Sequence, residues 1–83
     1  MSLEVEQMIE HIRHLIPKPG IAIDENTPLV SSGLIDSMAL VDLLFKLEDV
    51  TRMRIPAGKV QPKDMNTVGL MLATAQRVGK PRK

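Results

Sequence analysis

Apolar residues recur at helical spacing in three segments of the chain. The first lies within residues 3–16, where the apolar set is Val5, Met8, Ile9, Ile12, Leu15 and Ile16. Steps of three and four residues are typical of one face of an amphipathic helix. We expect Ser2 to cap this helix and Pro17-Lys18-Pro19-Gly20 to end it, because proline cannot continue the helical hydrogen-bond ladder.

The second helix is predicted from Asp36 or Ser37 to about Val50, with Asp36 as its N-cap. It carries two apolar stripes: a core face of Leu40, Leu43, Leu44 and Leu47, and a separate flank of Met38, Val41 and Phe45. The third helix is predicted to begin near Asn66 or Thr67 and to end at Gly79 and Pro81. Its stripe consists of Val68, Met71, Leu72, Ala75 and Val78.

Two irregular regions separate these helices. Residues 17–36 form a long connection, and we expect it to pack on the core through Ile21, Ile23, Leu29, Val30, Leu34 and Ile35. Gly33 is expected to adopt a backbone angle that other residues avoid. Residues 51–65 are predicted to hold at most one short helical turn, from Ala57 to Gln61, limited by Pro62.

No segment alternates with period two for long enough to predict a strand. The expected fold is therefore all-α: a small three-to-four-helix bundle with a long packed loop between the first two helices. It forms one domain over residues 1–83, in which residues 79–83 are a flexible, basic tail.

Composition narrows the function classes. Cysteine is absent and the net charge is only +1, so we expect no disulfide and no thiolate metal site. Phe45 is the single aromatic residue, which argues against a stacking nucleic-acid binder. His11 and His14 lack a third metal ligand and are expected to be surface residues. Without a signal-peptide pattern or a membrane-length apolar run, we expect a cytoplasmic monomer without membrane insertion.

Ser37 is the candidate functional residue. Its position at a helix start would by itself suggest capping, but Asp36 already explains the cap. A hydrolase nucleophile needs a nearby base and an oxyanion hole, and only His11 and His14 could supply an imidazole. A phosphate ester suits the position, because a helix N-terminus offers free amides and a partial positive charge.

The string Gly33-Leu34-Ile35-Asp36-Ser37-Met38 resembles the attachment motif of the acyl carrier and peptidyl carrier protein family. The pair Ile55-Pro56 after the second helix is also similar to that family, and the resemblance covers about residues 27–72. It implies that Ser37 carries a 4′-phosphopantetheine arm donated from coenzyme A by a phosphopantetheinyl transferase, with Asp36 as its motif neighbour. It also implies a non-catalytic carrier, whose partner surface is formed by Met38, Val41, Asp42 and Phe45.

The resemblance is closest to D-alanyl and stand-alone aminoacyl carrier proteins. Fatty-acid carriers are strongly acidic along the second helix, whereas Lys46, Arg52 and Arg54 lie in or after it here. We therefore expect an amino acid as thioester cargo, loaded by an ATP-dependent ligase and delivered to a downstream acyltransferase or synthetase. Two alternatives stay open: a fatty-acid or polyketide-type acyl carrier protein, and a cofactor-free helical interaction module in which Ser37 only caps.

Overall fold

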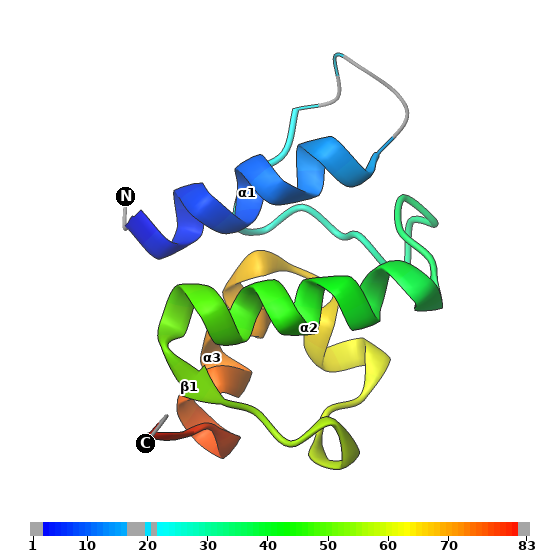
Figure 1. The fold of residues 1–83 in the computed structure, drawn as a ribbon. Coiled ribbons are helices and arrows are strands. Elements are labelled where there is room, and N and C mark those ends of the chain that lie inside the picture. Colours follow the sequence, from blue (N-terminus) through cyan, green and yellow to red (C-terminus); the bar gives the residue numbers. More distant parts are fainter. Residues whose placement is uncertain (1–2, 17–19, 21, 82–83) are drawn as a thin grey trace.

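Three α-helices form most of the structure. The computed structural model describes residues 3–16, 20 and 22–81. Helix α1 spans Leu3–Leu15, α2 spans Ser37–Thr51 and α3 spans Val68–Val78. Figure 1 shows α1 lying alongside α2, above it in this view, while α3 lies behind α2. The predicted helices are thus confirmed, whereas the predicted cap Ser2 and most of the predicted stop at residues 17–19 lie outside the described residues.

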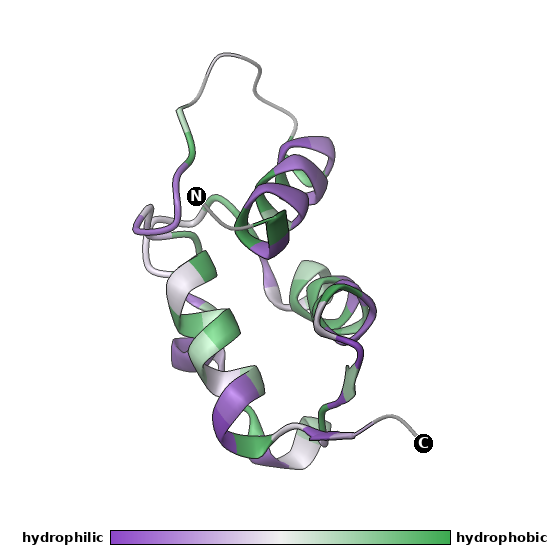
Figure 2. Ribbon diagram, turned by 90° about the vertical axis from the view of Figure 1, so that its left-hand side faces the viewer, coloured by the Kyte–Doolittle hydropathy of each residue, from purple (hydrophilic) through white to green (hydrophobic). Residues whose placement is uncertain are grey.

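The helices meet through the apolar stripes that the spacing predicted. All three contribute residues without exposed surface to one core, among them Met8, Ile12, Leu43, Leu47, Val68 and Met71. Of the predicted positions, Leu15, Leu40, Leu44, Leu72 and Val78 are only partly buried at its margin. Figure 2 shows hydrophobic residues along α2 and a more hydrophilic outer side on α1. Burial of these stripes is the main stabilising force of the fold.

The long loop between α1 and α2 packs on this core, as expected. Ile23, Leu29 and Ile35 are buried, and Val30 and Leu34 pack against them. Ile21, predicted to help, lies outside the described residues. The loop is therefore fixed to the core along its second half, which leads directly into α2.

A small antiparallel sheet corrects the prediction of a purely helical fold. Strand β1, Met53–Arg54, pairs with β2, Lys80–Pro81, in the register Met53 with Pro81 and Arg54 with Lys80. Each strand has two residues, too few to show a period-two pattern. The segment expected to be a free tail is thus paired at Lys80 and Pro81, although both side chains are exposed.

The region between β1 and α3 holds two short 3₁₀ helices instead of the single predicted turn. The first, η1, spans Ala57–Lys59, and the second, η2, spans Pro62–Met65. Pro62 begins η2, because proline is tolerated at the first position of a helix, where no amide partner is needed. Over the described residues, the fold is small and mostly helical, with three α-helices and one two-stranded sheet.

Candidate functional site

The site is built around the start of α2. Asp36 has extended backbone angles, φ −104° and ψ −177°, and its Oδ1 accepts a 2.9 Å hydrogen bond from the Ala39 amide. This confirms the predicted N-cap. Gly33 has φ +80°, a conformation that residues with a side chain rarely adopt. The turn at Gly33 thus lies three residues before the cap Asp36.

Ser37 is the first residue of α2, and its side chain is exposed. Within the described part of the chain, no group forms a hydrogen bond with its hydroxyl. The Ser37 and Met38 amides belong to the first turn, where backbone N–H groups have no helical acceptor. The hydroxyl and the two amides are therefore available to an incoming group at the positive end of the helix dipole.

A shallow groove of about 250 Å³ begins at Ser37 and runs between α2 and the 3₁₀ segments. The α2 side is formed by Leu40, Val41 and Leu44, and the opposite side by Ala57, Val60, Gln61, Pro62 and Met65. Most of these side chains are apolar. Leu40 and Leu44 were expected to be core residues alone. The groove could not be predicted, because the 3₁₀ segments facing these leucines have no periodic pattern.

The predicted partner surface forms a patch on the outer face of α2. Met38, Val41 and Phe45 are 83%, 57% and 66% exposed, whereas Leu43 and Leu47 on the inner face are 0% exposed. The three residues line a second shallow groove of about 350 Å³ together with Asp42. Since isolated exposed apolar residues are common but clustered ones are rare, this patch, which we call the outer patch, is a candidate contact surface.

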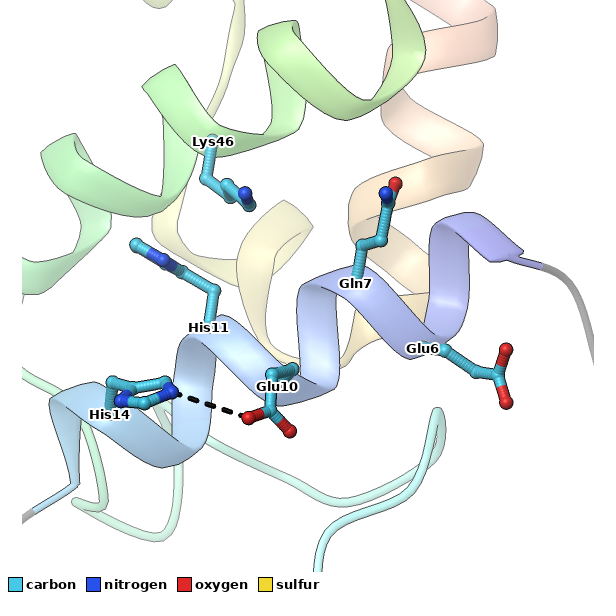
Figure 3. Close-up of a pocket in the computed structure, with 6 residues that line it drawn as sticks. All are labelled: Glu6, Gln7, Glu10, His11, His14 and Lys46. Atoms are coloured by element: carbon cyan, nitrogen blue, oxygen red, sulfur yellow. Dashed lines mark hydrogen bonds and ion pairs between the residues drawn. The ribbon is translucent and has the colours of Figure 1, made fainter.

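His11 connects α1 to the outer patch. Its Nε2 lies 2.5 Å from Oδ2 of Asp42, and its side chain is partly exposed, so His11 is at the surface as expected but is paired with α2. Figure 3 shows His11 directed towards α2 and Lys46, with His14 bonded to Glu10 on α1. The only imidazole that contacts α2 in the described structure therefore pairs with Asp42 rather than with Ser37. Among the described residues, neither imidazole is paired with the Ser37 hydroxyl, as the base of a serine nucleophile would be.

Asn66, which was expected only as a possible start of the third helix, bonds to the loop that leads to Ser37. It lies between η2 and α3, and its side-chain Oδ1 accepts hydrogen bonds of 2.9 Å from the amides of both Val30 and Ser31. Its carbonyl oxygen accepts from the Leu29 amide at 2.7 Å. Asparagine commonly binds backbone groups in turns, but nothing local indicates a partner 36 residues away.

Other kinds of site receive no support from the described residues. Residues 3–16, 20 and 22–81 contain no group of three histidine, cysteine or acidic side chains that could hold a metal ion. No helix in the same ranges is long and apolar enough to cross a membrane. Comparison of the sequence with protein-family profiles and with curated proteins finds no match.

Proposed function

We propose that this protein is a phosphopantetheine-dependent carrier with an acyl-carrier-like helical fold, in which Ser37 bears the arm. The observation that carries the proposal is the exposed Ser37 hydroxyl at the capped start of α2, within Gly33-Leu34-Ile35-Asp36-Ser37-Met38. Among the described residues this hydroxyl has no hydrogen-bond partner. The acyl cargo is a thioester on the arm. The protein acts as substrate and carrier for other enzymes and performs no catalysis itself.

The surroundings of Ser37 fit a phosphodiester-linked arm. The phosphate would lie near the free amides of the first turn, which favour an anion. One carboxylate oxygen of Asp36 accepts a hydrogen bond from the Ala39 amide. This bond moderates the repulsion between the carboxylate and the phosphate. The arm supplies the reactive thiol, and the chain itself has no cysteine.

The attachment step is a phosphoryl transfer performed by a separate transferase. The Ser37 Oγ attacks the pantetheine phosphorus of coenzyme A, and the bond to the nucleotide phosphate breaks. The serine proton passes to a base of the transferase, and adenosine 3′,5′-bisphosphate leaves. This chain contributes an accessible hydroxyl at a fixed position, which lowers the entropic cost of the encounter.

The outer patch supports docking of partner enzymes beside the arm. Met38 is adjacent to Ser37, and Val41 and Phe45 follow on the same flank of α2. Such partners comprise the transferase, an ATP-dependent aminoacyl or acyl ligase and a downstream acyltransferase or synthetase. Buried apolar side chains at the centre of an interface commonly contribute most of its affinity.

The first test is incubation with coenzyme A and a broad-specificity phosphopantetheinyl transferase, followed by intact mass measurement. Wild type should gain one phosphopantetheinyl group, and Ser37→Ala should gain none while retaining its helical circular dichroism. If wild type stays unmodified while a known carrier is modified in the same mixture, the proposal fails.

The cargo is tested on the modified protein. We propose an amino acid, because Lys46, Arg52 and Arg54 make α2 and its end less acidic than a fatty-acyl carrier would require, and charge complementarity guides partner choice. Aminoacyl-adenylate-forming ligases should load the thiol, and fatty-acyl ligases should not. The reverse result would assign a fatty-acid or polyketide carrier instead.

A further inference from the structure

We propose that Asn66 is the positioning residue for Ser37: it clamps the loop that presents Ser37 to the modifying enzyme. The clamp itself is inferred from the structure. Its effect on the kinetics of modification rests on the proposed function. Asn66 belongs to the junction of η2 and α3, far along the chain from Ser37.

The clamp consists of three hydrogen bonds to consecutive loop amides. Leu29 donates to the Asn66 carbonyl oxygen at 2.7 Å, and Val30 and Ser31 both donate to its Oδ1 at 2.9 Å. Three successive N–H groups thus converge on one residue. Asn66 and Val30 are partly buried, whereas Ser31 is exposed. The Val30 amide therefore carries a desolvation cost when it is left without its acceptor.

The clamped amides connect to Ser37 through a short, defined path. Leu29 is fully buried, and its carbonyl oxygen accepts a 3.2 Å hydrogen bond from the Ile35 amide. Between them the chain turns at Gly33, whose amide donates to the Val30 carbonyl oxygen at 3.1 Å. Ile35 is followed by the cap Asp36 and by Ser37. Fixing Leu29 to Ser31 therefore fixes the turn that sets the start of α2.

A second tether holds the same two regions together but bypasses Asn66. The Gly69 amide on α3 donates to the Glu25 carbonyl oxygen at 2.9 Å. It attaches the earlier part of the loop, upstream of the clamp. Loss of the Asn66 side chain should therefore loosen residues 30–37 while the rest of the loop stays attached to α3.

The kinetic consequence concerns binding more than the transfer step. The loosened segment would adopt the conformation that the transferase binds for only a fraction of the time. The apparent affinity for the transferase is then the affinity of that conformation multiplied by this fraction. We expect Asn66→Leu, which keeps the side-chain size but has no acceptor, to raise the KM for the carrier about fivefold or more with kcat within about twofold. Asn66→Asp keeps an oxygen that can accept from both amides, so it should restore the wild-type KM.

The experiment measures transferase kinetics of wild type, Asn66→Leu, Asn66→Asp and the matched control Asn26→Ala, with thermal unfolding of each. Asn26 lies in the same loop, and no side-chain hydrogen bond of Asn26 is seen among the described residues. Raised KM in Asn66→Leu alone, with rescue in Asn66→Asp, supports the clamp. Equal KM in folded Asn66→Leu and wild type overturns it. Absence of modification in wild type overturns the proposed function. The clamp is then tested by amide hydrogen exchange.

Amide hydrogen exchange of unmodified wild type tests the clamp without any variant or enzyme. The Val30 and Ser31 amides should exchange at least about tenfold more slowly than in an unstructured peptide, as expected of bonded amides in a closed segment. Exchange at the unstructured rate at both amides would overturn the inference, even if Asn66→Leu fails to fold.

Discussion

The two faces of α2 carry similar residues and have opposite environments. Leu43 and Leu47 on the inner face are fully buried, whereas Met38, Val41 and Phe45 on the outer face are mostly exposed. Hydrophobicity alone therefore does not determine which residues stabilise this fold. The inner face accounts for stability, and the outer patch is available for a contact that the isolated domain does not make. Substitutions on the two faces should separate stability from function.

The largest effect is expected on the inner face. Leu47→Ala removes buried side-chain volume from the core, so it should lower the free energy of unfolding by about 2–5 kcal/mol. Urea denaturation followed by circular dichroism measures this change. A loss below about 1 kcal/mol would show that the inner face is not the tightly packed region described above.

The N-cap Asp36 supports the whole start of α2, including both faces. Its removal should have an intermediate effect on the free energy of unfolding. Asp36→Ala removes the acceptor of the Ala39 amide and should lower the free energy of unfolding by about 0.5–2 kcal/mol. Asp36→Asn is the matched control, because asparagine is an equally good N-cap, and it should be nearly neutral. Equal losses in both variants would mean that the carboxylate charge, rather than the cap, stabilises the helix.

The pair of His11 and Asp42 tests how firmly the outer patch is tied to α1. A double-mutant cycle with His11→Ala and Asp42→Ala should give a coupling energy of about 0.2–1 kcal/mol, because both side chains are partly solvent-exposed. Chemical denaturation of the four proteins supplies the values. A coupling of zero would show that the contact between these side chains does not stabilise the packing of α1 on α2.

The smallest stability effect is expected on the outer patch. Val41→Ser should change the free energy of unfolding by no more than about 0.5 kcal/mol, because the side chain is exposed and the two residues have similar helix propensities. If the patch binds partner enzymes, the same variant should slow modification of Ser37 and loading of the arm. Unchanged rates in Val41→Ser, and likewise in Phe45→Ser, would remove the functional role proposed for the patch.

The sequence was sufficient where a feature depends on local chemistry. Helix spacing predicted α1, α2 and α3, and the residue type before α2 predicted the cap Asp36, whose side chain accepts a hydrogen bond from the Ala39 amide. The predicted start of the third helix near Asn66 or Thr67 agrees with the observed N-cap Thr67. Gly33 was expected to adopt an unusual backbone angle and has positive φ. Each of these features is determined by residues within one or two helical turns.

The remaining features depend on residues that are distant in the sequence. The pairing of Met53 with Pro81 and the bonds from Asn66 to the loop join segments with no shared pattern. Gly79 illustrates the same limit. It was predicted to stop α3 and is indeed its C-cap. Its φ is ordinary, but a Cβ there would collide with the Ala75 carbonyl oxygen and crowd Met53. The clash with Ala75 arises within α3, whereas the crowding by Met53 arises only because β1 lies beside the end of α3.

The central claim, that Ser37 carries the arm, is tested most directly by locating the modification within the chain. After incubation with coenzyme A and the transferase, wild type, Ser37→Ala and Ser31→Ala are digested and sequenced by tandem mass spectrometry. We predict one phosphopantetheinyl group on Ser37 in wild type and in Ser31→Ala, and none in Ser37→Ala. A group on Ser31 or Ser32, or an unmodified wild type beside a modified control carrier, would contradict the account.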